Sequence, residues 1–315
     1  MTSNRLTRRE LLRASGAASL AAALPFSLPA AQAQQSGAKK VSAAAAVSNP
    51  LKPPAEGSIP VAFLISDGAV VIDFAGPWEV FENVMIGNRM DLFQCYTVAE
   101  TTKPVRASGG MQIVPNYTLA NAPQPKIIVI PAQGEPTKPM LDWIRNSSRA
   151  ADLTMSVCTG AFVLAQTGLL AGKSATTHHG ALMSLQASYP DIHVKRGARF
   201  VDENNLATAA GLSSGIDLAL HVVERYYGRD VATETAYNLE YQGLGWMNAN
   251  SNTAYAKLRV STEQHPRCPI CDMEVEPATA LTTRYQGKTY RFCSADHKQQ
   301  FDSNPQAIVE FLKQG

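Results

Sequence analysis

The chain has no excess of charge of either sign, no dense set of cysteines and no internal repeat. Its 315 residues include 28 Lys and Arg against 26 Asp and Glu, and five Cys. Without an excess of basic residues, a broad positive surface for nucleic acid or for an anionic membrane is not expected. Five cysteines in a chain of this length do not form a disulfide scaffold. These absences argue against a nucleic-acid-binding protein, a membrane-surface protein and a disulfide-rich scaffold.

The first 33 residues predict an export signal. Thr7 to Arg13 reads Thr-Arg-Arg-Glu-Leu-Leu-Arg, a twin-arginine pattern, and Ala31 to Ala33 forms a small-x-small cleavage site after an Ala-rich stretch. That stretch is too short and too weakly apolar to span a membrane, and Pro25 and Pro29 would interrupt a buried helix. Removing the signal leaves 24 basic and 25 acidic residues. We therefore expect a periplasmic protein without stable membrane insertion.

Composition divides the remaining chain into four regions. They are a flexible tether (34–57), an α/β domain (58–247), a polar linker (248–264) and a small C-terminal module (265–315). In the α/β domain, apolar runs without polar alternation are separated by helical patterns, which favours a parallel sheet covered by helices on both faces. The predicted strands are 61–65, 93–98, 127–130, 153–157 and 206–210, and helices are expected to begin at Pro77, Lys138, Thr159, Gly180, Ser214 and Asp230.

Cys158 lies at the junction between an apolar strand and a helical stretch that starts at Thr159. A thiol on such a turn is close to the unpaired N–H groups and positive dipole end of the helix, which lowers its pKa. This is the arrangement of a nucleophile elbow. The alternative is a buried cysteine that packs as a small hydrophobic side chain, which we expect for Cys95 within the strand 93–98.

Two further loops follow strands that run parallel to the one before Cys158, so we expect all three loops at the same edge of the sheet. This edge, outside the carboxyl ends of the strands, is where such sheets bind ligands. Asp73 follows the first strand and precedes the helix expected from Pro77, and Gln133 and Gly134 follow the third strand. An acid near a thiol can act as its general acid or base, whereas an aspartate here could also cap a helix. Backbone N–H groups at Thr159 and in the Gln133–Gly134 loop could stabilise developing charge.

Five segments of the α/β domain carry motifs in a fixed order: 72–77, 156–165, 168–178, 210–219 and 238–241. They resemble the ThiJ/PfpI superfamily, whose members have a class I glutamine amidotransferase-like, flavodoxin-like fold. Within it, the sequence resembles the isonitrile hydratase branch and the sensor-like domains of certain AraC-type regulators. A regulator of that kind would need a C-terminal helix-turn-helix domain, and here a Cys-rich module stands instead.

The resemblance implies a nucleophilic Cys158, hydrogen-bonded to Asp73, with Thr159 shaping the pocket. In a hydratase-like reaction the thiolate would attack the terminal carbon of an isonitrile, Asp73 would exchange the proton, and water would release an N-substituted formamide. The resemblance implies no cofactor in this domain, and it predicts a homodimer.

Two positions bear on the substrate. The family usually has Gly-Gly after the proline that ends the third strand, whereas this sequence has Ala132 and Gln133. The side chain of either residue is expected to narrow the substrate pocket or to redirect a backbone amide of this loop. His178 ends a Thr-Thr-His segment that is mainly structural in the branch of the family that this sequence resembles. The alternative is a Cys–His dyad with Cys158, in which His178 would be catalytic.

The C-terminal module contains Cys268, Cys271, Cys293 and His297 in the pattern Cys-x2-Cys, a spacer of 21 residues, and Cys-x3-His. The last two are four residues apart at a helix start and face the same way, so the four side chains can surround one metal ion. Three cysteines and one histidine cannot form two disulfides. A module of about 50 residues has little core, so the metal would supply much of its folding free energy. Zinc is the simplest ion, and copper(I) would also suit the thiolates.

This module also resembles a known family. The segments 268–273, 285–293 and 301–305 look like a YHS domain, which is related to treble-clef-like metal modules. Met273 and His265 are possible additional ligands.

Two functional classes follow. The first is an exported, cysteine-dependent hydratase or hydrolase with a metal-stabilised accessory module. The second is a periplasmic metal-handling or redox-stress protein in which Cys158 is oxidised as a sensor or protector.

Overall fold

The computed structural model describes residues 49–257 and 259–313. The predicted export signal and most of the predicted tether therefore lie outside the described residues. Within the described part of the chain, no helix is long and apolar enough to cross a membrane.

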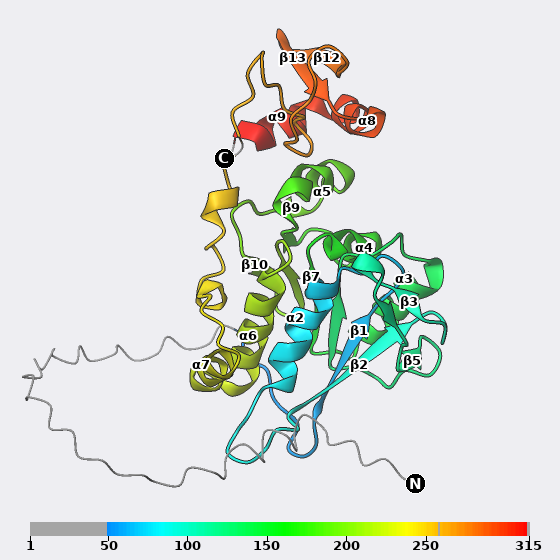
Figure 1. Ribbon diagram of the computed structural model, residues 1–315, viewed down its shortest axis with the longest axis vertical. Coiled ribbons are helices and arrows are strands. Elements are labelled where there is room, and N and C mark those ends of the chain that lie inside the picture. Colours follow the sequence, from blue (N-terminus) through cyan, green and yellow to red (C-terminus); the bar gives the residue numbers. More distant parts are fainter. Residues whose placement is uncertain (1–48, 258, 314–315) are drawn as a thin grey trace, which may run out of the picture. The chain divides into compact units, whose positions relative to one another are not determined.

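The α/β region is built on one seven-stranded sheet with the order β10-β11-β7-β6-β1-β2-β5. Only β10 runs antiparallel to its neighbour, so the flavodoxin-like α/β prediction is confirmed (Figure 1). The order reverses its direction between β1 and β6, and ligand sites in such sheets lie near that point, at the carboxyl ends of the strands. The strands are β1 (Ile59–Leu64), β2 (Phe93–Ala99), β5 (Tyr117–Thr118), β6 (Ile127–Ile130), β7 (Leu153–Val157), β10 (Phe200–Asp202) and β11 (Leu206–Ala209).

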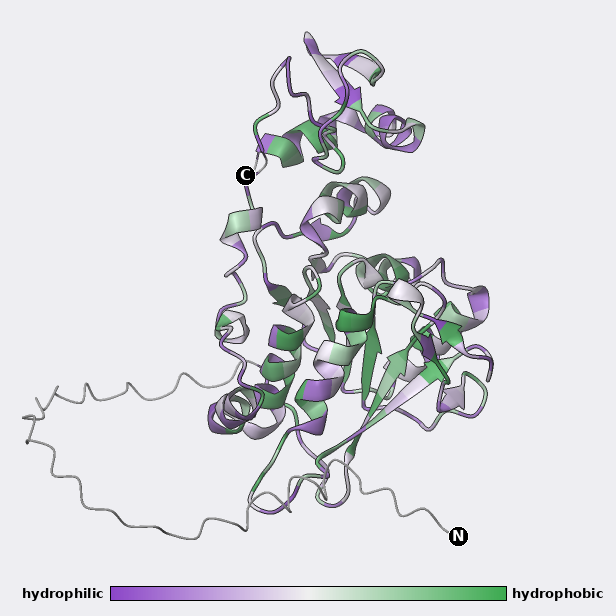
Figure 2. Cartoon of the chain, viewed as in Figure 1, coloured by the Kyte–Doolittle hydropathy of each residue, from purple (hydrophilic) through white to green (hydrophobic). Residues whose placement is uncertain are grey.

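Helices cover both faces of this sheet, as the unbroken apolar strands predict. One face packs against α2 (Val71–Glu82), α6 (Ser214–Tyr227) and α7 (Arg229–Asn238), and the other against α3 (Lys138–Ser148) and α4 (Gly160–Gln166). Shorter elements complete the region: β3 (Val105–Arg106), β4 (Gln112–Ile113), β8 (Ser174–Ala175), β9 (His193–Val194) and α5 (Leu182–Ser188). In Figure 2 the central strands carry the most hydrophobic colours of this region.

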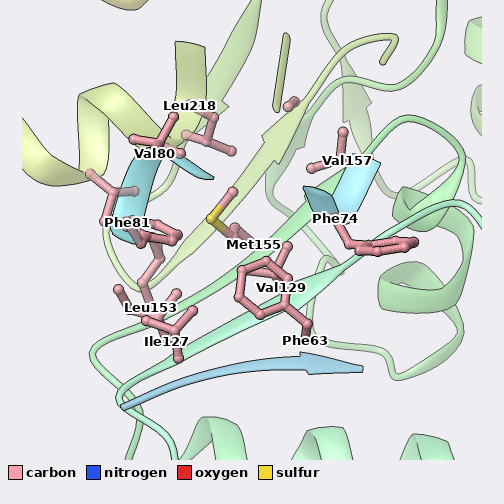
Figure 3. Close-up of a cluster of buried hydrophobic side chains, with 14 of the residues drawn as sticks. Phe63, Phe74, Val80, Phe81, Ile127, Val129, Leu153, Met155, Val157 and Leu218 are labelled. Carbon is pink, nitrogen blue, oxygen red and sulfur yellow. The ribbon is translucent and has the colours of Figure 1, made fainter. Parts of the chain in front are cut away.

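The strand side chains alternate between two cores. Phe63 and Val129 lie with Phe81 of α2 and Leu218 of α6 on one face (Figure 3), while neighbouring side chains such as Leu64 point to the α3 and α4 face. Burial of each such side chain contributes about 1.5–3 kcal/mol. Cys95 of β2 is half-buried against the first core, as expected of a packing residue.

The start of α2 differs from the prediction. The helix begins at Val71 rather than at Pro77, which lies inside it and is buried. The N–H of Val71 is satisfied by the Ser108 side chain, and packing against α6 holds the helix through the proline. A proline in a helix lacks one backbone donor, which tertiary packing offsets here. Asp73 is consequently a first-turn residue of α2 and not a loop residue.

The C-terminal module has its own small sheet and two helices. A hairpin of β12 (Leu281–Tyr285) and β13 (Lys288–Phe292) is followed by α8 (Ala295–Ser303) and α9 (Pro305–Lys313). Phe292 and Phe301 pack with ring centroids 5.2 Å apart in its core. The side chain of Ser294 accepts from the N–H of His297 and so caps α8, which starts the helix directly after Cys293.

Candidate active site and candidate metal centre

Cys158 occupies a sharp turn between β7 and α4. Its φ is +58°, a left-handed conformation that costs a non-glycine residue about 1–2 kcal/mol. Two hydrogen bonds fix the turn: the Cys158 N–H donates to the Ala210 carbonyl at 2.9 Å, and its carbonyl accepts from the Thr177 hydroxyl at 2.8 Å. At Gly160 an added Cβ would lie 2.2 Å from the Ile130 carbonyl, so only glycine fits there. The predicted strand-to-helix elbow is thus confirmed.

Asp73 lies beside Cys158 and is fully buried. Its Oδ2 accepts a hydrogen bond from the N–H of Ala132 at 3.1 Å, so the loop after β6 orients the carboxylate. In the described part of the chain, Oδ1 meets no donor at full hydrogen-bond geometry. The Cys158 thiol is nevertheless close enough to act as a donor to Asp73, which lowers the pKa of the carboxyl by less than burial raises it. Helix α2 and the loops after β6 and β7 converge at one sheet edge, as predicted.

The pKa values correct one prediction. Burial raises the pKa of Asp73 to about 6. Burial, followed by the nearby Asp73 carboxylate, also raises the pKa of Cys158, and the N–H groups of Leu212 and Thr159 offset this only in part. The predicted lowering of the Cys158 pKa is therefore wrong. Removal from water outweighs the dipole of α4, which is only seven residues long. At neutral pH the pair consists of an aspartate and a thiol.

Other predicted residues have different roles. The N–H of Gly134 donates to the Asp67 carbonyl at 3.0 Å, so it is occupied and unavailable to developing charge. The Gln133 side chain donates to the Leu64 carbonyl at 3.2 Å, while its own amide oxygen is buried without a partner among the described residues. The Nδ1 of His178 accepts from the Gly180 N–H, and burial lowers its pKa. His178 is thus a neutral capping residue.

Leu212 and the network behind it were not found from the sequence. The Leu212 N–H reaches the Cys158 sulfur from the loop after β11. Arg199 holds this loop, because it donates to the Ser213 hydroxyl at 3.0 Å and to the Asp217 carboxylate at 2.6 Å. Asp217 also accepts from the Tyr241 hydroxyl at 3.0 Å. Only the folded chain brings β10, α6 and the segment after α7 together at this point.

The four predicted metal ligands do converge. The ligand atoms of Cys268, Cys271, Cys293 and His297 all lie within 4.8 Å of one another. The Cys271 and Cys293 sulfurs are 3.6 Å apart, and the Cys268 sulfur is 3.6 Å from the His297 Nδ1. Zinc bonds of about 2.3 Å to sulfur give a tetrahedral sulfur–sulfur edge of roughly 3.7 Å, so the group fits a tetrahedral ion.

The two additional candidate ligands stay outside this group. His265 contacts Glu274 at 2.7 Å through its Nδ1, and the Met273 side chain is exposed. The backbone turn of the first two ligands is closed by a hydrogen bond from the Asp272 N–H to the Cys268 carbonyl at 2.9 Å. A hydrogen bond from the Cys271 thiol lowers the pKa of Cys268 to about 4, so one thiolate is ready for a metal.

Comparison with known proteins assigns the α/β region to a protein family. A model of the DJ-1/PfpI family matches residues 60–225. The chain belongs to the DJ-1/PfpI family. The Cys158 elbow and Asp73 lie inside the matched segment of this DJ-1/PfpI protein, and the Cys/His group lies beyond it.

The relatives include both an enzyme and a transcriptional regulator. The isonitrile hydratase of Pseudomonas putida is 34% identical over 193 residues, or 58% of this chain and 79% of that protein. The HTH-type transcriptional regulator CdhR of Pseudomonas aeruginosa is 26% identical over 251 residues, or 73% of this chain and 72% of that protein. A THiJ/PfpI family protein from Pseudomonas syringae superposes with a TM-score of 0.53 at 27% identity, covering 59% of this chain and 76% of that one.

Asp73→Asn is expected to stabilise this DJ-1/PfpI protein at neutral pH by about 1–3 kcal/mol. The folded-state pKa of Asp73, about 6, lies above its ordinary value of 3.8. Between those values the folded state binds more protons than the unfolded state, so wild-type stability falls as the pH rises through this window. The asparagine variant avoids that loss and can still accept from the Ala132 N–H. Urea unfolding at pH 4, 6 and 7.5 measures the difference.

Asp217→Asn is the matched control, because Asp217 is equally buried but paired with Arg199. Removing its charge leaves the arginine without its counter-charge and should destabilise the protein. Equal destabilisation by both variants would contradict the assignment of Asp73 as a desolvated carboxylate that forms no ion pair with the described residues.

Proposed function

We propose that this protein is a cysteine-dependent hydratase that converts isonitriles to N-substituted formamides. The observation that carries the proposal is the juxtaposition of Asp73 with the Cys158 thiol on its elbow. A carboxylate with a pKa of about 6 is matched to act as a general base near neutral pH. The 34% identity to the Pseudomonas putida isonitrile hydratase supports this reaction class.

The reaction begins with a protonated thiol. Asp73 takes the S–H proton while the Cys158 sulfur bonds to the terminal carbon of the isonitrile, and the N–H groups of Thr159 and Leu212 face the sulfur as its charge develops. The proton then passes from Asp73 to that carbon, which gives a thioimidate. Asp73 next takes one proton from a water whose oxygen bonds to the same carbon, and passes this proton to the nitrogen. Asp73 then takes the second proton of that water from the new hydroxyl group and gives it to sulfur as the carbon–sulfur bond breaks, which releases the formamide and restores the thiol and the carboxylate.

The accessory module, in this proposal, is a YHS-like unit that Cys268, Cys271, Cys293 and His297 hold together around one metal ion. Three sulfurs and one nitrogen favour zinc, which supplies folding free energy and no redox chemistry. The amino-terminal pattern supports export to the periplasm by the twin-arginine route.

A metal-handling role is the second candidate. The preassembled Cys/His group favours it, because Cys293 is exposed and an ion from solvent can therefore reach the group. The redox-sensor form of this candidate is less well supported. A sensor thiol is an accessible thiolate, whereas Cys158 is 7% exposed and its pKa is raised.

Incubation of the purified full chain with cyclohexyl isonitrile tests the proposal. Formation of N-cyclohexylformamide, followed by NMR, should exceed the rate without protein and should respond to isonitrile concentration with saturation. An equal rate with and without protein, for a folded and metal-loaded sample, would reject the hydratase and leave the metal-handling candidate.

A further inference from the structure

A cavity lies in the C-terminal module, and neither Cys158 nor Asp73 lines it. Its volume is about 930 Å³, within the range of small-molecule pockets. The hairpin between β12 and β13, the end of α9 and the segment 259–263 line it. Pro266, Pro269, Val309 and Leu312 provide apolar wall.

Cationic side chains are concentrated in this cavity. Residues 259–313 contain seven Lys and Arg and seven Asp and Glu, so the segment as a whole is neutral. Only two of those acids line the cavity, Glu263 and Asp272. Five of the seven cations do: Arg259, Arg267, Lys288, Arg291 and Lys313. The cavity surface therefore carries an excess of positive charge, and a concave surface with such an excess concentrates anionic ligands.

Asp272 uses its acceptors to hold two of these arginines in place. Its carboxylate accepts from the Arg259 Nε at 2.9 Å, and its backbone carbonyl accepts from Arg259 and from Arg267 at 2.6 and 3.0 Å. The φ of Asp272 is +58°, which turns this carbonyl toward them. The two guanidinium groups are thus positioned before any ligand arrives, which reduces the ordering cost of binding.

Two buried guanidinium donors of the cavity lack an acceptor. Among the described residues, the Nε–H groups of Arg267 and Arg291 have no hydrogen-bond partner. These two Nε atoms are enclosed by protein, so a ligand in the cavity would meet the terminal N–H groups of the two arginines, both of which line it. One terminal nitrogen of Arg267 already contacts the Glu274 carboxylate at 3.5 Å. The observation that favours a ligand is therefore the excess of cationic side chains on one concave surface.

We propose that this cavity binds a small molecule that carries two or more carboxylate or phosphate groups. Carboxylate and phosphate oxygens are the acceptors that arginine pairs with best, often through two parallel hydrogen bonds. Lys288 and Lys313 would neutralise a further anionic group, and the apolar wall would contact the carbon skeleton. The inference is independent of the reaction at Cys158.

Isothermal titration of the metal-loaded full chain tests the proposal with two probes, tricarballylate and fructose 1,6-bisphosphate. We expect at least one to bind with a Kd below 1 mM at low salt, and more weakly at 0.5 M NaCl because the contacts are ionic. The two probes separate a polycarboxylate site from a polyphosphate site. Acetate, which has one anionic group, should bind at least tenfold more weakly.

Arg291→Gln should weaken binding of the successful probe at least tenfold, the loss expected for a charged hydrogen bond. Arg284→Gln is the matched control, because Arg284 is on the other strand of the same hairpin and does not line the cavity. Metal content and circular dichroism should be unchanged in both variants. Equal weakening by the two variants, or binding of a tetraglutamate peptide with no binding of either small probe, would overturn the proposal.

Discussion

Cys158→Ala is expected to lower the rate of cyclohexyl isonitrile hydration at least about a thousandfold, because the sulfur forms and breaks the covalent bond in each turnover. Alanine tolerates the turn as well as cysteine does, since neither residue favours a positive φ. Cys158→Ser should be nearly as inactive, because the hydroxyl is a much weaker nucleophile. The formamide assay measures both variants, and circular dichroism checks that they fold.

Cys95→Ala provides the control for this experiment. Cys95 is half-buried on β2, and burial raises its pKa, so it is an inert packing thiol. Its replacement should leave the rate within about twofold of wild type. Loss of activity in Cys95→Ala together with retention in Cys158→Ala would place the nucleophile elsewhere.

The wild-type rate should also rise with pH through about 6. Asp73 has a raised pKa of about 6 and must be ionised to accept the thiol proton. Protonation below that pH removes the base, so the rate should fall as the solution becomes more acidic. The same formamide assay, run from pH 4.5 to 8, records the profile.

Removal of the metal should unfold the C-terminal module and leave the α/β region folded. Structural zinc contributes about 10–16 kcal/mol in small metal-binding units, more than the few buried side chains of this module can replace. Cys271→Ser, or treatment with a chelator, should abolish protection from hydrogen exchange across residues 281–313. Peptides that contain β1, β6 and β7 should keep their protection from hydrogen exchange. Mass spectrometry resolves the two sets of peptides, and elemental analysis shows which ion is lost.

His265→Ala is the matched control for metal removal. This histidine belongs to the same module but pairs with Glu274, outside the four-ligand group. It should retain one metal ion per chain and normal hydrogen-exchange protection. Full protection of a metal-free Cys271→Ser variant would show that packing of Phe292 and Phe301 suffices to fold the module.

The parts that could be predicted from sequence depend on local patterns. The buried strands appear as unbroken apolar runs, and β6 and β7 have the predicted limits, Ile127–Ile130 and Leu153–Val157. Cys158 could be placed on an elbow because a strand and a helix meet there. The metal ligands could be grouped because Cys-x2-Cys and Cys-x3-His each bring two ligands together within one turn.

Other features arise only from contacts between distant segments. The start of α2 depends on Ser108, which is 37 residues from Val71. The Gly134 N–H is occupied by the carbonyl of Asp67 rather than free. Neither contact is visible in the sequence around the residues that form it, so neither could be predicted from local patterns.

The sequence alone determined the five central strands β1, β2, β6, β7 and β11, the elbow at Cys158 and the four-ligand set, because these depend on neighbours along the chain. The edge strands β5 and β10, which are only two and three residues long, were not predicted. The tertiary structure decided the protonation of Cys158 and Asp73 and the grouping of five cations around one cavity. Both depend on how completely water is excluded and on which charges from distant segments face each other. Those quantities exist only after the chain has folded.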